Sequence, residues 1–227
     1  MFYKQEVNEK KTFYSQDKQD EILETNIFKG YRCGYFVNIG ANDGKTIDNT
    51  LFFEETNGWN GINIEPIPET YQKLILNRPH CINLNCAIDT ENGEAEFFCN
   101  KGYTEMISGL TKYYDYRHDM RRQVENQYYG SHTEKIMIPT RTLESIFDEY
   151  KIKEVNFISI DVEGAEFSVI KSINFDKVFV DVIIFENNYP DVSIPIIEYL
   201  QNKGFLQINV NCMDIMMIHK DSKFHKN

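Results

Sequence analysis

The 227-residue chain lacks several features that would place it in a specialised class of protein. No apolar run approaches the roughly 18 residues of a membrane-spanning helix, and the N-terminus lacks the basic and then apolar layout of a signal peptide. The five cysteines are odd in number and form no C-x-x-C pair, which favours free buried thiols over a disulfide framework or a zinc site. We therefore expect a cytoplasmic protein with no membrane partner.

Basic residues are scarce relative to acidic ones. The chain has 24 Lys and Arg against 35 Asp and Glu, which gives a formal net charge of −11. Such a charge repels a phosphate backbone, and the densest basic segment, residues 117–122, is short and contains an acid. We therefore expect no nucleic-acid partner. The length and the 41% hydrophobic composition predict a single domain over residues 1–227, and the sequence leaves its oligomeric state open.

Phosphate-binding motifs are missing as well, because the chain has neither a G-x-G-x-x-G cradle nor a P-loop. What it has is a Gly turn at residues 36–44 (FVNIGANDG), between an apolar run and a segment from Thr46 to Glu55 with helical apolar spacing. A strand, turn and helix in this order lets backbone N–H groups approach a ligand at the carboxyl end of a parallel strand. The turn without a phosphate cradle favours an adenosine-bearing cofactor that has no phosphates.

Glu65 supports this interpretation, because it ends the next predicted strand. Its carboxylate would accept both ribose hydroxyls of the adenosine. S-adenosylmethionine is such a cofactor, and its sulfonium charge suits an acidic rim. In an open α/β sheet the ligand lies beyond the carboxyl ends of the strands. The predicted strand ends carry Asn38, Gly40, Glu65, Ala87, Asp89, Asp161, Glu163, Glu186 and Asn187.

Short apolar runs that alternate with helical patterns predict a parallel sheet with helices on both faces. The predicted strands cover residues 35–39, 61–66, 81–88, 94–99, 135–139, 155–160, 181–186, 205–210 and 214–219. A helix is expected over Pro68–Asn77, and another over Thr142–Tyr150 with Thr140 or Thr142 as its cap. A tight turn near Asn211 and Cys212 would make the final strand antiparallel to its neighbour.

Two segments fall outside this pattern. Residues 1–13 are expected to form a loose arm, followed by a helix with Ser15 as N-cap, Asp17 and Asp20 in its first turn, and Gly30 as its stop. Residues 100–135 are polar and tyrosine-rich, with weak periodicity. This insert is either a surface excursion whose tyrosines pack on the domain, or a substrate cover whose tyrosines stack on sugar or ring faces.

Taken together, the motifs resemble the FkbM family of S-adenosylmethionine-dependent methyltransferases. The resemblance runs in order over residues 14–218, through YSQ with Gln19-Asp20, FVNIGANDG, Asn49-Thr50, Trp59-x-Gly61, IEP, Asn77-Arg78 and IDVEGAE. It implies a Rossmann-like methyltransferase fold, with a seven-stranded sheet whose last strand is antiparallel, and methyl transfer to oxygen on substrates that include sugar and polyketide hydroxyls. Two residues depart from the family pattern: Asn38 stands where Asp is usual, and Asp48 stands where Ser often precedes Asn-Thr.

The Gly turn and the resemblance together assign a set of residues to the cofactor. These are Asn38, Gly40, Ala41, Asn42, Asp43, Gly44, Glu65, Pro66, Ala87 and Asp161.

Methyl transfer to a hydroxyl needs a group that takes up its proton or lowers its pKa. Asp161, Glu163 and Glu186 are the predicted catalytic residues. Asp161, Glu186 and Asn187 also resemble the oxygen ligands of metal-dependent catechol-type O-methyltransferases, and such ligands suit Mg²⁺. The alternative is that Asp161 and Glu163 cap the following helix and contact the cofactor. Further candidate bases are His118 and His132, each of which would otherwise be a solvated loop histidine.

The predicted function is S-adenosylmethionine-dependent O-methyl transfer to a hydroxyl of a sugar, a glycan or another small molecule. A ribose methyltransferase acting on RNA would need Lys at the position of Glu186. An amino-group methyltransferase acting on nucleobases would need an Asn/Asp-Pro-Pro-aromatic turn after the fourth strand, where Asp161-Val162-Glu163-Gly164 stands. A catalytically inactive binding module with the same fold is the alternative, and Asn38 is its best argument.

Overall fold

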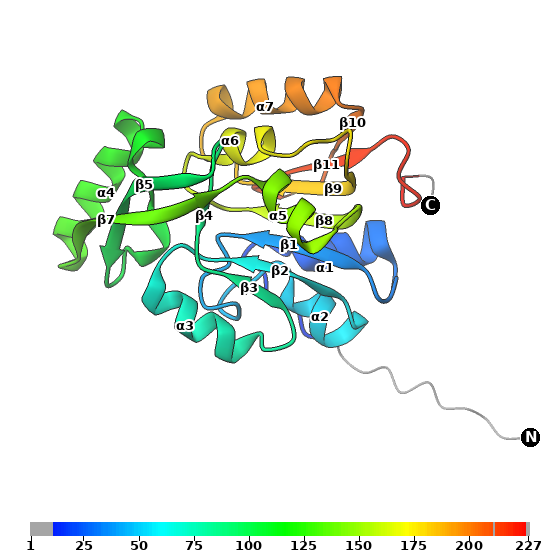
Figure 1. The fold of residues 1–227 in the computed structure, drawn as a ribbon, viewed down its shortest axis with the longest axis horizontal. Helices are drawn as coiled ribbons and strands as arrows, with labels where there is room; N and C mark the ends of the chain where they lie inside the picture. The colour runs from blue at the N-terminus through cyan, green and yellow to red at the C-terminus, as the bar shows by residue number, and fades with distance from the viewer. Residues whose placement is uncertain (1–10, 211, 226–227) are drawn as a thin grey trace, which may run out of the picture.

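A seven-stranded sheet forms the centre of the molecule (Figure 1). Its strands are β1 (Tyr35–Ile39), β2 (Asn60–Ile64), β3 (Ile82–Leu84), β8 (Glu154–Ile160), β9 (Phe179–Phe185), β10 (Phe205–Ile208) and β11 (Ile215–His219). The spatial order is β10-β11-β9-β8-β1-β2-β3, and β11 is antiparallel to both of its neighbours while the other pairs are parallel. The predicted parallel sheet with an antiparallel final strand is confirmed. The computed structural model describes residues 11–210 and 212–225.

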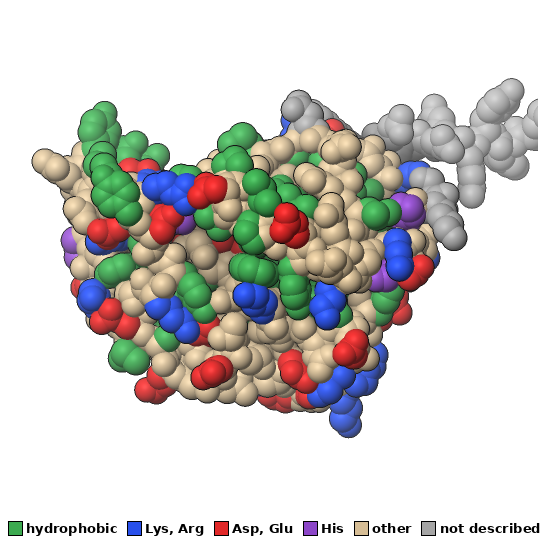
Figure 2. All heavy atoms as spheres, turned by 90° about the horizontal axis from the view of Figure 1, so that it is seen from above, with side chains coloured by type: hydrophobic (Ala, Val, Ile, Leu, Met, Phe, Trp, Pro, Cys, Tyr) green, Lys and Arg blue, Asp and Glu red, His purple; other side chains and the backbone are tan. Residues whose placement is uncertain are grey.

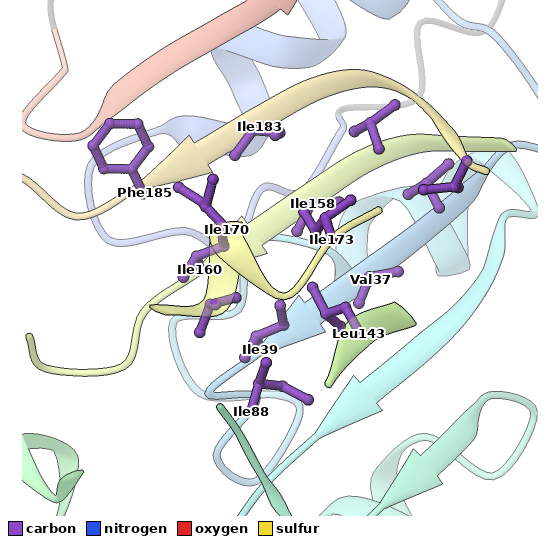
Figure 3. Close-up of a cluster of buried hydrophobic side chains, with 14 of the residues drawn as sticks. Val37, Ile39, Ile88, Leu143, Ile158, Ile160, Ile170, Ile173, Ile183 and Phe185 are labelled. Carbon is purple, nitrogen blue, oxygen red and sulfur yellow. The ribbon is translucent and has the colours of Figure 1, made fainter. Parts of the chain in front are cut away.

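Alternate residues of the central strands face two different layers of helices. In the pairing of β1 with β8, Phe36 lies beside Phe157 on one face and Val37 beside Ile158 on the other. The aliphatic face packs against α5 (Leu143–Tyr150), α6 (Glu166–Lys171) and α7 (Pro190–Asn202), as Figure 3 shows in part. The aromatic face packs against η1 (Leu23–Phe28), which continues α1 (Gln19–Ile22), and against α2 (Leu51–Asn57). A further helix, α3 (Pro68–Asn77), joins β2 to β3 as predicted.

A second, four-stranded sheet lies at the end of the molecule toward which β1 and β2 point, at the left in Figure 1. It is formed by β4 (Ala87–Ile88), β5 (Gly93–Lys101), β6 (Gly109–Leu110) and β7 (His132–Arg141), in the order β4-β7-β5-β6. Two short 3-10 helices, η2 (Glu105–Ile107) and η3 (Thr111–Tyr113), and the 14-residue helix α4 (Tyr116–Tyr129) belong to the same region, residues 87–141, which contains the predicted insert of residues 100–135 and is called the insert from here on. The insert therefore forms a small subdomain over the carboxyl ends of the main-sheet strands.

Several predicted elements need correction in this region. The single strand expected over residues 81–88 is two strands in different sheets, β3 and β4. The helix α4 was not predicted, because its sequence is polar on most sides and gives little apolar periodicity. Asp115 begins α4 as its N-cap, accepting hydrogen bonds from the backbone N–H groups of Arg117 and His118. Neither interpretation of the insert, the surface excursion or the substrate cover, included this helix.

The N-terminal prediction was also partly wrong. The first helix begins at Gln19, and Ser15 does not cap it in the expected way. Instead the Ser15 hydroxyl accepts from Asp20 N at 3.1 Å, and the buried Asp20 carboxylate accepts from Tyr14 N at 2.6 Å. Phe13 packs on Phe52, with ring centroids 4.6 Å apart, so residue 13 is not part of a loose arm. Lys11, also in the predicted arm, pairs with Glu24. Residues 1–10 of that arm and the predicted turn residue Asn211 lie outside the described residues.

The helix that follows the Gly turn begins later than expected. The prediction began a helix at Thr46, whereas α2 begins at Leu51. Asp48 causes this delay, because its Oδ1 accepts from Thr50 N and Leu51 N at 2.7 and 2.8 Å and holds the chain in a turn. Within residues 11–210 and 212–225, no helix is both long and apolar enough to cross a bilayer.

Candidate active site

A cavity of about 670 Å³ opens where the main sheet meets the insert. The Gly turn, Glu65 and the residues that follow β8 and β9 form one side of it. The other side comes from η2 and α4 of the insert, with Tyr103, Met106, Arg121 and Tyr129 among the lining residues. The cavity thus lies at the position that an open parallel sheet offers to a ligand.

Gly40 is held where no other residue fits. Its φ is +82°, and a Cβ built on it would lie 1.8 Å from the carbonyl oxygen of Asp161. The neighbouring strand ends are joined by backbone bonds, since Gly40 N and Ala41 N both donate to Ile64 O, at 3.1 and 3.0 Å. Three strand ends therefore converge on this turn with only backbone between them, which leaves its surface open to a ligand.

Glu65 is fixed beside the Gly turn. Its Oε2 accepts from Asn42 N at 2.9 Å and its Oε1 accepts from Ile67 N at 2.7 Å. Burial raises the pKa of this carboxyl to about 7 in spite of the two bonds that favour the ionised form. Each carboxylate oxygen keeps a second acceptor position. Glu65 is therefore preorganised to accept hydroxyl donors from a ligand.

The predicted cofactor residues separate into two groups. Those that line the cavity are Asn38, Gly40, Ala41, Asn42, Glu65, Pro66, Ala87 and Asp161. Asp43 and Gly44 do not line it, and the structure gives them supporting roles. The Asp43 carboxylate accepts from Lys45 N and Thr46 N at 2.9 and 2.7 Å. A Cβ on Gly44 would lie 2.5 Å from Leu74, so this glycine lets α3 approach the turn.

The two residues that depart from the resembled family contact each other. Asn38 Nδ2 donates to Asp48 Oδ2 at 2.8 Å, and both side chains are buried. Asp48 Oδ1 in turn accepts from the fully buried Arg78 at 3.1 Å, and Arg78 also pairs with Glu54. The acid missing at position 38 is therefore present one hydrogen bond away, at position 48.

Asp161, Glu163 and Glu186 form a carboxylate cluster on the cavity wall, with ligand oxygens all within 4.8 Å of one another. Asp161 is open to the cavity but lies deep within the molecule, and its surroundings together with the nearby Glu186 and Asp214 raise its pKa to about 8. Burial also raises the pKa of Glu186 to about 7, and burial and the other two acids raise that of Glu163. Such a cluster attracts cations and holds protons near neutral pH.

The cluster does not cap the following helix. Ala165 is the N-cap of α6, which has no side-chain capping bond, and Gly164 N donates instead to Glu166 Oε1 at 3.0 Å. The proposed capping role of Asp161 and Glu163 is therefore wrong. Glu163 has a φ of +53° and Gly164 one of +99°, so the turn after β8 is left-handed at two successive residues. Strain of this kind often accompanies functional turns.

The insert supports this strained turn from outside. A Cβ on Gly164 would lie 3.0 Å from Tyr113 O and 3.3 Å from the ring of His118, so both pack closely on the turn. His118 is 6% exposed, and its Nδ1 lies 2.9 Å from Asp115 Oδ1. It does not line the cavity, and it is not a solvated loop histidine as expected. Its position behind Gly164 gives it a packing role.

The other two predicted candidates lie at different places. His132 is exposed at the start of β7 and does not line the cavity. Asn187 lines the cavity, but its Oδ1 accepts from the Ser193 hydroxyl at 2.6 Å. Asp161 and Glu186 form a group of three carboxylates with Glu163, whereas the predicted ligand set combined them with Asn187.

One face of α4 completes the cavity. Arg121, Glu125 and Tyr129 follow one another at intervals of four residues and all line it. Arg121 Nη1 lies 3.5 Å from Glu163 Oε2, and its Nε donates to Glu125 Oε1 at 3.0 Å. The Tyr129 ring stacks on Tyr103, with centroids 3.8 Å apart and planes at 26°. The sequence interpretation singled out the two tyrosines but missed Arg121 and Glu125, whose four-residue spacing was the available signal.

Polar residues around the start of α1 also reach the cavity. Gln16, Asp17 and Gln19 line it, and Gln19 Nε2 donates to Asp214 Oδ2 at 2.8 Å. Gln16 and Gln19 belong to the motif that supported the family resemblance, but no site role was predicted for them.

Comparisons with known proteins show the family and the fold. The family model "Methyltransferase FkbM domain" matches residues 38–206. The fold is similar to the crystal structure of the methyltransferase FkbM from Methylobacillus flagellatus KT, with 13% identity, a TM-score of 0.51, and coverage of 82% of this chain and 43% of that one. The chain thus spans less than half the length of that protein. The likeness confirms the predicted Rossmann-like methyltransferase fold.

Two other solved structures are more distant. The precorrin-6y C5,15-methyltransferase from Geobacter metallireducens GS-15 has 10% identity and a TM-score of 0.47, over 89% of this chain and 86% of that one. The Aeropyrum pernix fibrillarin in complex with natively bound S-adenosyl-L-methionine has 9% identity and a TM-score of 0.45, over 88% and 71%. A comparison with curated proteins found no match.

Proposed function

The chain belongs to the FkbM methyltransferase family, and from this premise we propose that it transfers a methyl group from S-adenosylmethionine to a hydroxyl of a sugar, a glycan or another small molecule. The observation that carries the proposal is the position of the carboxylate cluster. It shares one cavity with the Gly turn on one side and the tyrosines of the insert on the other. A donor and an acceptor held in one such cavity react with a large gain from proximity.

The residues of the Gly turn suit the cofactor. The bare backbone at Gly40 would accept its amino-acid part, and the carboxylate of Glu65 would accept the ribose hydroxyls. When bound, S-adenosylmethionine supplies a methyl group on a positively charged sulfur. The acidic wall formed by Asp161 and Glu186 favours that charge.

The charges of the cavity favour an acceptor without phosphate. Among the described residues that line it, nine carry carboxyl groups and Arg121 alone is basic. The acids are Asp17, Asp48, Glu65, Glu105, Glu125, Asp161, Glu163, Glu186 and Asp214. A nucleic acid or a nucleotide-linked sugar would meet repulsion here, whereas a neutral hydroxyl compound would not.

The chemistry asks the carboxylate cluster to accept one proton. As the acceptor oxygen forms its bond to the methyl carbon, the carbon–sulfur bond breaks and the hydroxyl proton has to leave. Glu163 and Glu186 are the proposed bases, because their raised pKa values make them stronger proton acceptors than ordinary carboxylates. The close approach of Arg121 to Glu163 would keep that carboxylate oriented.

The same cluster offers three oxygen ligands, a donor set that suits Mg²⁺. With Mg²⁺ bound, Asp161, Glu163 and Glu186 would hold it, and the metal would lower the pKa of the acceptor hydroxyl. The presence of Arg121 beside Glu163 competes with this arrangement. A metal requirement is therefore the second form of the proposal, and it is separated from the first by EDTA.

Calorimetry with S-adenosylmethionine tests the first step, and we expect saturable binding to a single site. Methyl transfer is then screened on free sugars, nucleotide-linked sugars, glycans and small phenols, with and without EDTA. We expect free sugars to be favoured over nucleotide-linked ones. The absence of binding at millimolar cofactor would sink the enzyme proposal and leave a binding module, the alternative that Asn38 suggested.

Variants of the cluster test the mechanism. Glu163→Gln and Glu186→Gln are expected to lower turnover at least a hundredfold while S-adenosylmethionine still binds. Glu198→Gln is the matched control, because Glu198 is an exposed acid on α7 that does not line the cavity. Unchanged rates in both cluster variants, measured on the acceptor found in the screen, would remove these residues from the mechanism.

A further inference from the structure

Exposed apolar side chains are concentrated on the insert. Among the described residues, fourteen large hydrophobic side chains are exposed, and eight of them lie between residues 101 and 137. These eight are Tyr103, Met106, Tyr116, Met120, Val124, Tyr128, Tyr129 and Met137. Figure 2 shows hydrophobic side chains projecting at the left end of the molecule, the end at which Figure 1 places α4, and the outline is indented beside them. A concentrated apolar surface of this kind marks a contact with something apolar.

The helix α4 carries four of these side chains in one line. Tyr116, Met120, Val124 and Tyr128 follow at intervals of four residues, with exposed fractions of 75%, 45%, 59% and 80%. Successive members of such a series are turned by only about 40° around the helix, so the four form an apolar stripe along its outer face. The stripe does not stabilise the packing of α4, because this helix packs on the insert mainly through other residues, such as Arg122 and Asn126.

The apolar stripe adjoins the cavity. The cavity-lining residues of α4 begin at Arg121, which lies about 20° beyond Tyr128 in projection around the helix. The rings also touch, since Tyr128 meets Tyr129 edge to face with centroids 4.8 Å apart, and Tyr129 stacks on Tyr103 at 3.8 Å. Tyr103 and Tyr129 both line the cavity. A continuous apolar path therefore leads from the mouth of the cavity onto the outer face of α4.

We propose that the methyl acceptor is amphipathic, with its hydroxyl-bearing polar end in the cavity and an apolar chain lying along the apolar stripe. This inference rests on the proposed function, because it takes the cavity to be the acceptor site. Because the stripe is continuous with the cavity, we assign this surface to the acceptor itself. On α4, the basic side chains beside the stripe are each paired with acids, Arg117 with Asp115 and Asp191 and Arg121 with Glu125, which disfavours an acceptor chain that ends in a carboxylate.

Two glucosides with the same polar end and apolar chains of different length test the proposal. Methyl β-glucoside and octyl β-glucoside, the latter below its micelle concentration, are titrated into the protein by calorimetry in the presence of S-adenosylhomocysteine. Each methylene buried on a protein surface improves affinity about fourfold. We therefore expect the octyl compound to bind at least tenfold more tightly. Saturation-transfer NMR should show contact for both the sugar and the chain protons.

Surface variants assign the gain to the stripe. The double variant Met120→Gln/Val124→Gln should bring the two glucosides to within about twofold of each other. Leu206→Gln is the control, because Leu206 is 44% exposed on β10, outside the insert, and should keep the gain. Equal binding of the two glucosides to the unmodified protein, including no binding of either, overturns the proposal, as does a gain that survives in the double variant.

A second copy of the chain is the rival occupant of the stripe. Sedimentation of the unmodified protein and of the double variant decides this, since a dimer that dissociates in the variant would assign the stripe to self-association and overturn the proposal. Failure of the proposed function gives a different result. In that case S-adenosylmethionine does not bind, while the octyl gain and its loss in the double variant remain.

Discussion

The two sides of the cavity are built from different materials. On the side of the main sheet, the ligand surface is backbone and buried carboxylate, held by strand ends that meet at Gly40. On the side of the insert it is the exposed rings of Tyr103 and Tyr129 together with half-buried charged side chains of α4 and η2. A surface made of backbone can hardly vary without loss of the fold, whereas exposed side chains can. The proposed cofactor side is therefore fixed by folding, and the proposed acceptor side is free to be adapted to a substrate.

The largest effect is expected at a glycine on the side of the main sheet. Gly40→Ala places a Cβ 1.8 Å from Asp161 O at a φ of +82°, so the junction of β1 and β8 has to open. We expect a loss of roughly 4 kcal/mol or more in the free energy of unfolding, or failure to fold, measured by urea denaturation. Gly58→Ala is the matched control, because its φ is +67° but nothing lies within 4 Å, and the expected cost is about 1 kcal/mol. Equal costs would show that steric contact at Gly40 is unimportant.

The buried pair Asn38 and Asp48 should give the next largest effect. Asn38→Asp brings two carboxylates to hydrogen-bonding distance, and one of them has to take up a proton or separate. We expect a loss of about 2 kcal/mol in the free energy of unfolding. Adding Asp48→Ser removes the repulsion. The double variant should therefore be about 1 kcal/mol more stable than the sum of the two single effects predicts, and a double-mutant cycle measures this difference as a coupling energy. Additive effects of the two substitutions would mean that the positions are independent.

The region around the Gly turn shows which features the sequence predicts well and which it does not. The apolar runs of β1, β8 and β9 and the helices α3 and α5 follow from local patterns, and the Gly turn and Glu65 follow from their places at strand ends. The contact of Asn38 with Asp48 does not follow, because each position looks like a separate departure from a motif until the chain turns back at residues 40–50. Side chains ten residues apart reveal their pairing only through tertiary structure.

The insert was predicted poorly for a different physical reason. The predicted strands over residues 94–99 and 135–139 are present in β5 and β7, but the pairing that joins them, such as Phe97 with Ile136, is long-range and no local signal reports it. The helix α4 puts its apolar residues on the outside and its packing residues, such as Arg122 and Asn126, on the inside. A periodicity analysis assumes the reverse. The sequence therefore placed the proposed acceptor side of the cavity within residues 100–135, but it did not predict the helix that forms it.

The pH dependence of cofactor binding sharpens the comparison further. Burial raises the pKa of Glu65 from 4.5 to about 7, so its folded-state pKa lies above the unfolded value. The free protein accordingly loses the stability that protonated Glu65 contributes as pH rises from about 4.5 through 7. Binding of the ribose hydroxyls needs the ionised carboxylate, so the Kd for S-adenosylmethionine should fall about tenfold between pH 6 and pH 8. In Glu65→Gln, calorimetry should show a Kd that no longer falls tenfold between pH 6 and pH 8. An unchanged pH dependence of the Kd would assign the titration to another group.

The smallest effect on stability is expected on the acceptor side. Tyr129 is 46% exposed and its ring contacts the exposed rings of Tyr103 and Tyr128, so Tyr129→Ala should change the free energy of unfolding by no more than about 0.5 kcal/mol. Phe53→Ala, at a fully buried ring of the aromatic layer, should cost about 3–5 kcal/mol in the same urea titration. The affinity for S-adenosylmethionine should stay unchanged in Tyr129→Ala while the KM for the acceptor rises several-fold. A loss of cofactor affinity in this variant would join the two sides of the cavity into one cooperative unit, and the independence of the acceptor side would no longer hold.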